Sequence, residues 1–311
     1  MKAVILAGGK GTRMLPLTHT RPKVLLPLAG KPIIRHMVDD LVSLAGEGID
    51  IDEIVIVANY LEEKIKDFFS AQDCGVKITF MHQPETKGTG DALRAAGRIG
   101  EPFFAINGDE TFDRGTFVNL ARAFKEKAAL AVIGVAEVEK PQLYGVLEVD
   151  GEGRLLRLLE KPSEPPCNLV NAGVYMFAPD IFDYIERLQP SARGEYELTD
   201  AIIAMRDETQ LVYCAPAEGW KSVSVPWDLL DANAAKLAGL AKKEDKNVII
   251  GKNVELKPGV HIEGNVFIGD GSVIGPNCYI RGDTSIGRNC RIGNGVEIKN
   301  SIIMDDSNVP H

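Results

Sequence analysis

A glycine-rich loop near the start of the chain carries residue types suited to binding phosphate. Gly8, Gly9 and Gly11 follow a short apolar run that is typical of a buried strand. Because glycine has no Cβ, the backbone N–H groups of such a turn can approach an anion closely. Arg13 then adds a forked guanidinium and Lys23 a compact ammonium. The pattern predicts a site for several phosphates, and the alternative interpretation is a strand-to-loop turn with surface charges.

Asp109 is the candidate ligand for a metal ion. It lies in Asn107-Gly108-Asp109, directly after a buried-strand pattern at residues 103–106. Ligands collect at the carboxyl ends of strands in open α/β sheets, and a hard cation such as Mg²⁺ takes carboxylate and phosphate oxygens. The alternative is an aspartate in an ordinary turn. We expect the adjacent Glu110 to be a solvated neighbour.

The glycine loop resembles a longer family signature. It matches neither Gly-x-x-x-x-Gly-Lys-Ser/Thr nor Gly-x-Gly-x-x-Gly. Residues 6–23, LAGGKGTRMLPLTHTRPK, instead resemble the signature Gly-Gly-x-Gly-Thr-Arg…Pro-Lys of the sugar-1-phosphate nucleotidylyltransferases, and LLPLAGKP at residues 25–32 continues the match. The resemblance implies a reaction in which an oxygen of a sugar 1-phosphate attacks the α-phosphorus of a nucleoside triphosphate and pyrophosphate leaves.

The resemblance also implies roles for single residues on the nucleotide side. Arg13, Lys23 and Lys161 would be catalytic, and Asp109 would hold Mg²⁺. Gln83 would read the edge of a pyrimidine, since a side-chain amide offers both a donor and an acceptor. We expect Asp91, in the next helix, to be a helix-end carboxylate. The implied nucleotide-binding residues are Leu6, Ala7, Gly8, Gly9, Gly11, Thr12, Gln83, Gly88, Thr89, Asn107 and Gly108.

On the sugar side, the resemblance points to three short motifs: Tyr144-Gly145, Glu160-Lys161-Pro162 and Asn171-Ala172-Gly173. Gly145 would leave space for the pyranose ring. Glu160 and Asn171 would hydrogen-bond its hydroxyls or an N-acetyl group, and Lys161 would bind its phosphate. Arg193 is a second candidate for that phosphate, with a surface turn as the alternative interpretation.

The chain departs from the family pattern at Ser222. Many members carry an aspartate or asparagine at this point, before the final helix, as a second metal ligand. Serine is a poorer metal ligand than a carboxylate. Either water completes the metal shell, or Asp228 moves inward to replace the missing ligand.

The order of apolar patterns predicts an α/β fold. Strand-like and helix-like segments alternate through the first 135 residues, which is typical of a layered sheet with helices on its faces. Two apolar segments at residues 146–149 and 155–159 then flank a Gly-rich turn and predict an antiparallel hairpin. The expected helices are residues 32–46, 61–69, 89–96, 114–127, 179–188, 199–206 and 227–242.

The end of the chain is a repeat with a period of six residues. Large apolar residues recur from Ile250 to Met304, and small or aliphatic residues recur two positions earlier, from Val248 to Ile302. This period indicates a parallel β-helix, of about three and a half coils at three hexads a coil. The pattern resembles the left-handed hexapeptide-repeat domains of some nucleotidylyltransferases. We therefore predict a Rossmann-like mixed-sheet nucleotidyltransferase domain at residues 1–241, a linker at 242–247 and a short left-handed β-helix at 248–311.

Composition limits the classes of partner. The net charge of −9 argues against a nucleic acid or an anionic membrane as partner, although a local cationic pocket for phosphate stays compatible with it. The cysteines are scattered and without Cys-x-x-Cys, which fits reduced thiols in a cytoplasmic protein. No apolar run is long enough to cross a membrane.

Together these features predict an enzyme that joins UTP or dTTP to N-acetylglucosamine 1-phosphate or glucose 1-phosphate. The alternatives are a mannose-1-phosphate guanylyltransferase, which Gln83 disfavours, and a non-catalytic assembly or regulatory subunit of the same fold. Relatives with this tail commonly associate as trimers, so we expect a homo-oligomer formed through the β-helix. In longer relatives the tail continues into an acetyltransferase. Because the chain ends in mid-repeat, we expect a shortened or partial chain without that second activity.

Overall fold

The structure is a computed structural model that describes residues 1–191 and 193–311. It divides into two compact units that are discontinuous in sequence. Unit 1 contains residues 1–11, 18–24 and 36–220, and unit 2 contains residues 12–17, 25–35 and 221–311. The sequence predicted a first domain that runs without interruption to residue 241. Unit 2 instead also contains the last helix before the repeats and two short segments from the N-terminal region.

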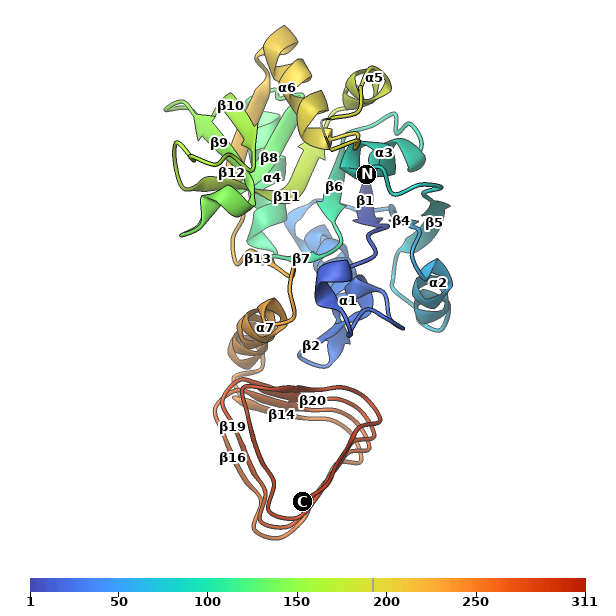
Figure 1. Cartoon of the computed structure of the whole chain (residues 1–311), viewed down its shortest axis with the longest axis vertical. Helices are drawn as coiled ribbons and strands as arrows, with labels where there is room; N and C mark the ends of the chain where they lie inside the picture. The colour runs from blue at the N-terminus through green and yellow to red at the C-terminus, as the bar shows by residue number, and fades with distance from the viewer. Residues whose placement is uncertain (192) are drawn as a thin grey trace. The chain divides into compact units, whose positions relative to one another are not determined.

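Unit 1 is built on a mixed β-sheet whose main strand order is β10-β9-β11-β6-β1-β4-β5 (Figure 1). Two further strands lie outside this order: β8 pairs with β11, and β12 pairs with β8. Its strands are β1 (Lys2–Ala7), β4 (Glu53–Ala58), β5 (Lys77–His82), β6 (Phe103–Asn107), β8 (Ala131–Glu137), β9 (Gly145–Val149), β10 (Leu155–Glu160), β11 (Leu169–Phe177) and β12 (Val212–Pro216). β1 is parallel to both β4 and β6, whereas β11 is antiparallel to β6, β8 and β9. The predicted α/β class with a mixed sheet is therefore confirmed.

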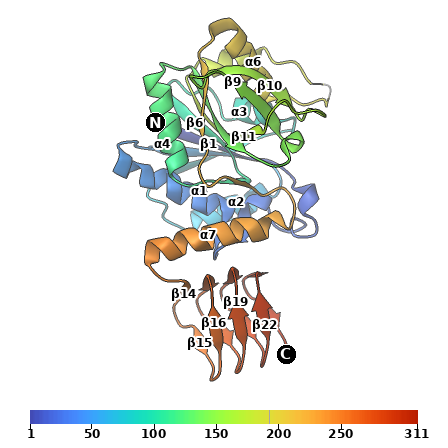
Figure 2. The same ribbon diagram turned by 90° about the vertical axis from the view of Figure 1, so that its left-hand side faces the viewer.

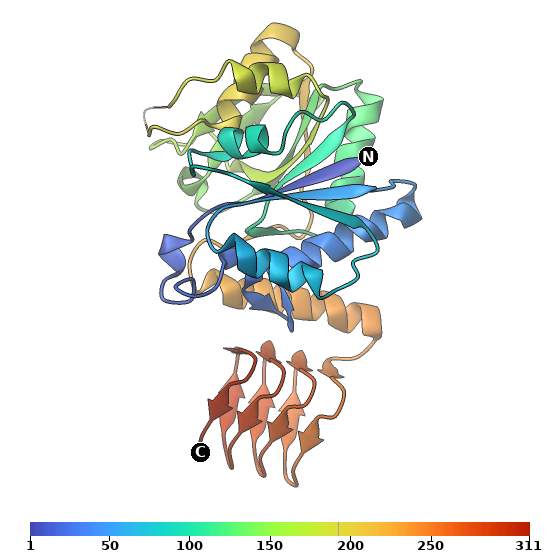
Figure 3. The ribbon, with the colours of Figure 1, turned by 90° about the vertical axis from the view of Figure 1, so that its right-hand side faces the viewer.

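Helices cover both faces of this sheet, because successive strand residues point to opposite sides. Val4 and Leu6 pack in one cluster with Leu93 of α3, whereas the ring of Phe104 lies edge-on against Phe117 of α4 at 5.5 Å between centroids. Figure 3 shows α2 and α3 on opposite sides of the strands. The helices are α1 (Ile33–Val42), α2 (Glu62–Ser70), α3 (Thr89–Ala95), α4 (Gly115–Glu126), α5 (Ile181–Glu186), α6 (Leu198–Thr209) and, in unit 2, α7 (Asp228–Glu244). Among the described residues, none of them combines the length and apolar character needed to span a membrane.

Unit 2 contains the predicted hexapeptide coil, whose parallel sheets form the sides of a triangular prism (Figure 1). Figure 2 shows their short strands stacked along the coil axis. The first side is β14 (Val248–Ile250), β17 (Val266–Ile268), β20 (Thr284–Ile286) and β23 (Ile302–Ile303). The second is β15 (Glu255–Leu256), β18 (Val273–Ile274), β21 (Arg291–Ile292) and β24 (Asn308–Val309), and the third is β16 (His261–Glu263), β19 (Tyr279–Arg281) and β22 (Glu297–Lys299).

The prediction of which residues fill the core of the coil is confirmed for the middle of the coil and is wrong for its last turn. The hexad positions between Val266 and Ile298 include the buried isoleucines of the interior. In β23, however, Ile303 pairs with Ile286, so this coil is 17 residues long where the earlier coils have 18. Ile303 therefore takes the inner position that we assigned by period to Met304.

In the first coil, Ile250 and Leu256 are 45% and 41% exposed, although both were predicted as core residues. Their strands β14 and β15 lie at the ends of their sheets, so each has a strand neighbour on one side only among the described residues. The helix before the coil, α7, continues to Glu244, into the segment predicted as a linker.

The first side of the coil is covered by other parts of unit 2. Phe267 of β17 packs so closely on Gly30 that a Cβ there would overlap its ring, and Gly30 has a φ of +81°. Next to it, the buried Asn233 of α7 accepts hydrogen bonds from Ala29 N at 2.8 Å and Ser285 Oγ at 2.9 Å. Its Nδ2 donates to the backbone oxygen of Asp283 at 3.1 Å. One asparagine therefore links the N-terminal segment, α7 and the coil.

We expect Glu53→Gln to destabilise the protein in a pH-dependent way. The Glu53 carboxylate pairs with Lys2 Nζ at 2.7 Å and with Lys77 Nζ at 2.8 Å. It also accepts a hydrogen bond from Thr79 Oγ1 at 2.5 Å. Hydrogen bonds from Lys2, Lys77 and Thr79 lower the pKa of Glu53 to about 2 from an ordinary 4.5. A lowered pKa stabilises the folded state above the unfolded pKa, and this contribution is lost as the pH falls. The loss in unfolding free energy, about 1–2 kcal/mol at pH 7, should shrink between pH 4.5 and pH 2. A pH-independent loss, or an equal loss in the exposed Glu126→Gln, would contradict this.

We expect Asn233→Ala to destabilise unit 2. The change would leave the buried Ala29 N–H and the Ser285 hydroxyl without their shared acceptor, which costs about 2–4 kcal/mol. The measurement is the free energy of unfolding in urea for the wild type, for Asn233→Ala and for a control variant. Asn294→Ala, at an exposed position of unit 2, is the matched control and should cost far less. If both variants unfold at the wild-type concentration of urea, Asn233 does not hold these segments together.

Candidate active site

The predicted glycine loop and the predicted acidic turn leave the same edge of the sheet. β1 and β6 are parallel neighbours, with Leu6 opposite Asn107, so both chains continue from their carboxyl ends side by side. Gly108 N donates to Leu6 O at 2.9 Å, and a Cβ on Gly108 would lie 2.9 Å from that oxygen. Glycine is therefore required where the acidic turn crosses β1, and it directs Asp109 toward the loop.

Lys23 and Asp109 form an ion pair at this edge. Their Nζ and Oδ2 atoms are 2.6 Å apart, and the two side chains are 9% and 34% exposed. Gly11 has a φ of +62°, and a Cβ there would lie 3.2 Å from the Cβ of Lys23. Thr18 Oγ1 donates to Gly11 O at 2.7 Å and fixes this part of the loop. The structure thus brings together two residues that were predicted from separate motifs.

The glycines of the loop have different surroundings. A Cβ on Gly8 would overlap the side-chain oxygen of Gln83, so Gly8 is needed for packing. No atom of the described residues lies within 4 Å of the place where a Cβ on Gly9 would stand. Thr12 and Arg13 follow in sequence but belong to unit 2, where Arg13 Nη2 lies 3.5 Å from Ser224 Oγ.

Gln83, the predicted base-reading residue, is buried at the end of β5. Its Nε2 donates to Asp91 Oδ2 at 2.9 Å and to Gly88 O at 3.3 Å. Asp91, expected to be a plain helix-end carboxylate, thus has a side-chain partner that sequence reasoning missed. Thr89 Oγ1 accepts a hydrogen bond from Leu198 N at 3.2 Å, which joins the start of α3 to α6.

The predicted sugar-side motifs converge. Gly145 and Glu160 are cross-strand partners in β9 and β10, and a Cβ on Gly145 would lie 3.3 Å from Glu160 Oε2 and 3.6 Å from the Cβ of Asn171. Asn171 Nδ2 donates to Tyr175 Oη at 2.8 Å, and its Oδ1 accepts from Gly173 N at 3.0 Å. Burial raises the pKa of Tyr175, so its phenol stays protonated.

Gly173 connects the sugar side with the nucleotide side. A Cβ on Gly173, whose φ is +72°, would lie 2.5 Å from Asn107 Nδ2. Asn107 Oδ1 is buried and has no hydrogen-bond partner among the described residues. An unsatisfied acceptor of this kind is costly unless a ligand supplies a donor.

The two predicted cations of the sugar side both contact Glu160. Lys161 Nζ lies 3.4 Å from Glu160 Oε1 and is 49% exposed. Arg193 Nη2 lies 3.4 Å from the same oxygen and 2.6 Å from Oε1 of the nearly buried Glu197. The guanidinium of Arg193 thus lies beside the predicted sugar residue Glu160, and its role in binding phosphate stays a prediction.

Glu110 is not the solvated neighbour that we expected. It is 8% exposed and accepts a hydrogen bond from Trp220 Nε1 at 2.9 Å. The Trp220 ring lies edge-on to Tyr144 with centroids 5.3 Å apart, so the acidic turn reaches the sugar motif through Trp220. Sequence signals do not reveal this link, since its residues are far apart in the chain.

The residues considered as second metal ligands have other contacts. Ser222 Oγ lies 3.3 Å from Ser224 Oγ. Asp228 Oδ2 accepts from Ser224 N at 2.7 Å and Val225 N at 2.8 Å, so this carboxylate holds its own loop. The described residues contain no group of three or more His, Cys, Asp or Glu side chains placed to hold a metal.

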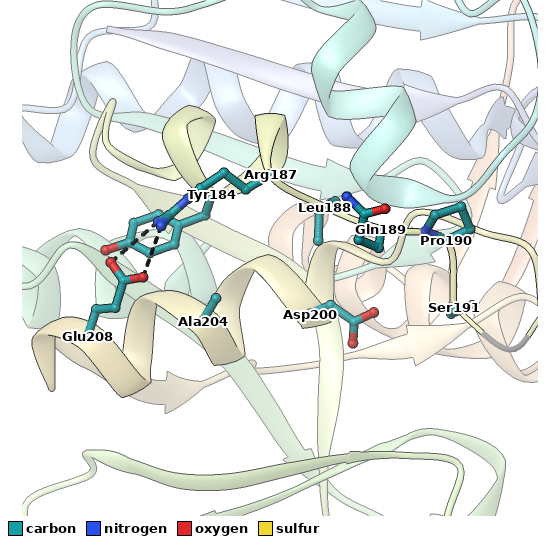
Figure 4. Close-up of a pocket in the computed structure, with 9 residues that line it drawn as sticks. All are labelled: Tyr184, Arg187, Leu188, Gln189, Pro190, Ser191, Asp200, Ala204 and Glu208. Atoms are coloured by element: carbon teal, nitrogen blue, oxygen red, sulfur yellow. Dashed lines mark hydrogen bonds and ion pairs between the residues drawn. The ribbon is translucent and has the colours of Figure 1, made fainter.

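A cavity of about 370 Å³ lies elsewhere in unit 1, between α5 and α6 (Figure 4). Its lining includes Tyr184, Asp200 and an ion pair between Arg187 and Glu208 with 3.0 Å between Nη1 and Oε1. None of the predicted site residues lines it.

Comparisons with known proteins identify the family of this chain. The family model for nucleotidyl transferase matches residues 2–239, and the model for bacterial transferase hexapeptide (six repeats) matches residues 247–282 and 265–300. The class is thus an α/β transferase head joined to hexapeptide repeats. The chain belongs to the nucleotidyl transferase family, which confirms the resemblance drawn from its signature.

The alignments with several relatives extend over the whole chain. "Bifunctional protein GlmU" of Methanococcus aeolicus is 39% identical over 324 aligned positions, which span 100% of this chain and 75% of that protein. "Bifunctional sugar-1-phosphate nucleotidylyltransferase/acetyltransferase" of Sulfurisphaera tokodaii is 38% identical, over 100% of this chain and 77% of that protein.

Solved structures match as well. A putative glucose-1-phosphate thymidylyltransferase from Bacillus anthracis is 29% identical with a TM-score of 0.65, over 75% of this chain and 94% of that one. A UDP-glucose pyrophosphorylase complexed with UDP-glucose, 24% identical, shares the fold with a TM-score of 0.67 over 76% of this chain and 98% of that one.

Proposed function

We propose that this chain transfers the nucleotidyl group of UTP or dTTP to N-acetylglucosamine 1-phosphate or glucose 1-phosphate and releases pyrophosphate. The observation that carries the proposal is the 2.6 Å contact between Lys23 and Asp109 beside the glycine loop. It joins a cation and a carboxylate from two separate motifs where substrates bind in α/β sheets. The name of the Sulfurisphaera tokodaii relative supports a sugar 1-phosphate as acceptor.

The chemistry needs positioning and neutralisation of charge. A phosphate oxygen of the sugar 1-phosphate would form the new bond to the α-phosphorus, while the bond from that phosphorus to the pyrophosphate oxygen breaks. The attacking oxygen is already ionised, so no general base is required. Lys23 would stabilise the negative charge that builds up on the α-phosphate, and Arg13 that on the departing phosphates. The open backbone at Gly9 would let the triphosphate approach the loop.

Asp109 is suited to hold a divalent cation. Family members of this kind are generally metal-dependent. One Asp109 oxygen contacts Lys23, and the carboxylate remains 34% exposed at the sheet edge. Mg²⁺ is commonly bound by one or two carboxylates together with substrate phosphates and water, which agrees with a single protein carboxylate here. When bound, Mg²⁺ would neutralise phosphate charge. Because Ser222 replaces the second ligand, we propose that water and substrate oxygens complete the shell.

The sugar would bind over Gly145, where a side chain is absent. Glu160 would accept hydrogen bonds from its hydroxyls, and the remaining N–H of Asn171 would donate to it. Lys161 and Arg193 both contact Glu160. A sugar phosphate would compete with this carboxylate for the two cations.

We expect Lys23→Ala to lower kcat by about 100-fold or more, since one preorganised charge near the reacting phosphate is lost. The assay follows pyrophosphate release from UTP, dTTP, CTP and GTP with each of three sugar 1-phosphates. Lys66→Ala, on the surface of α2, is the matched control and should keep wild-type kcat. Full activity of Lys23→Ala would remove the loop from the mechanism, and no turnover by the wild type with any pair would support a non-catalytic subunit.

We expect Asp109→Asn to abolish metal-dependent turnover. The folded state should persist at a cost of about 1–3 kcal/mol, because Lys23 loses its charged partner. Titration with Mn²⁺, followed by electron paramagnetic resonance in the presence of UTP, measures metal binding directly, with Asp67→Asn as the control. Wild-type activity that survives EDTA, or unchanged Mn²⁺ binding by Asp109→Asn, would contradict the assignment.

A further inference from the structure

The side-chain amide of Gln83 is fixed in one orientation by its surroundings. The same atom, Nε2, lies 2.9 Å from a carboxylate oxygen of Asp91 and 3.3 Å from the backbone oxygen of Gly88. Both neighbours can only accept hydrogen bonds, so the amide must turn its NH₂ group toward them. A rotation by 180° would place Oε1 against two other oxygens.

This orientation uses both N–H groups of Gln83 and leaves its oxygen for a ligand. Oε1 receives no hydrogen bond from the residues that the structure describes. It lies directly over Gly8 of the glycine loop. Gln83 is 3% exposed, so the rotation of its side chain is restricted. Toward a nucleotide on this loop, Gln83 therefore acts as an acceptor and not as a donor.

Asp91 is itself held in place. Its second oxygen, Oδ1, lies 3.8 Å from Arg94 Nη1 one helical turn further on. Arg94 donates to Ile185 O at 2.6 Å and stacks over the ring of Tyr196 at 5.0 Å. A carboxylate that served only the start of α3 would need none of these contacts.

We propose that Asp91 is a positioning residue that sets the base selectivity of this site through Gln83. The acceptor Oε1 suits a base that presents an imino N–H, as uracil and thymine do at N3. Cytosine presents a lone pair at N3, so two acceptors would face each other without water between them. The inference deepens the proposed function and rests on it, because it assumes that a pyrimidine nucleotide binds at the glycine loop.

The test compares UTP with CTP in wild type, Asp91→Asn and Asp91→Ala. An asparagine in place of Asp91 could pair with either end of the Gln83 amide, and an alanine there with neither. Both changes leave only the longer contact with Gly88 O to hold the amide in its orientation. We expect the ratio of kcat/KM for UTP to that for CTP to fall by about tenfold, since one orienting hydrogen bond to a charged group is lost. KM for the sugar 1-phosphate should not change.

Asp183→Asn is the matched control. Asp183 is another first-turn carboxylate paired with an arginine, Arg98, at 2.7 Å between Oδ1 and Nη2. It should keep the wild-type ratio. If Asp91 only stabilised its helix, the Asp91 variants would melt at lower temperature and lose activity equally with both nucleotides. An unchanged ratio in Asp91→Asn and Asp91→Ala, or an equal change in Asp183→Asn, overturns the proposal.

Equilibrium binding separates this inference from the proposed function. Calorimetric titration of the full chain with UTP and with CTP measures base selectivity without turnover. Wild type that binds UTP more tightly than CTP, with the preference reduced in the Asp91 variants, supports the role of Asp91 even if no sugar 1-phosphate reacts. Wild type that turns over but binds both nucleotides equally overturns the inference and leaves the transfer reaction in place.

Discussion

The ion pair between Lys23 and Asp109 is the interaction on which the rest of the candidate site depends. The side chain of Lys23 is 9% exposed, and burying an ammonium without a partner of opposite charge is costly. Asp109 supplies the partner only because β1 and β6 are parallel and end together. The contact uses Oδ2 of Asp109, so the same pairing that stabilises the lysine would leave the other carboxylate oxygen for the proposed metal ion. Under the proposed function, an anionic substrate would replace part of this pairing, so that neither charge is left buried alone.

Close packing explains most of the glycines around this pair. Gly8, Gly108 and Gly173 each stand where a Cβ would meet a polar atom of the site, respectively the oxygen of Gln83, the backbone of β1 and the amide of Asn107. The sequence pattern suggested that glycines allow phosphate to approach the backbone, and the open surroundings of Gly9 are compatible with that role. The others let protein atoms approach each other. The motif therefore specifies the interior of the site as much as the surface that a ligand would touch.

The parts of the fold that were predictable from sequence depend on local pattern. Strand ends, the glycine loop, the position of Asp109 after a strand and the hexads all follow from neighbouring residues. Contacts between distant segments did not. Glu110 looked solvated because its burial under Trp220 depends on tertiary structure, and Asp91 looked like a helix-end residue because Gln83 lies in another element. Unit 2 likewise collects segments from both ends of the chain, and this grouping depends on tertiary contacts.

The shortened coil near the end of the chain shows how one missing residue can change the role of a strand. A strict period would turn Ile302 inward, but the 17-residue spacing pairs it with Ser285, whose hydroxyl already faces Asn233 of α7. Ile302 and Met304 consequently pack against a cluster around Leu28 and Leu229, outside the coil. Because side chains alternate along a strand, a shift of one residue exchanges the inner and outer sets. The coil thus gains an apolar outer surface at the place where the helix and the N-terminal segment of unit 2 cover it.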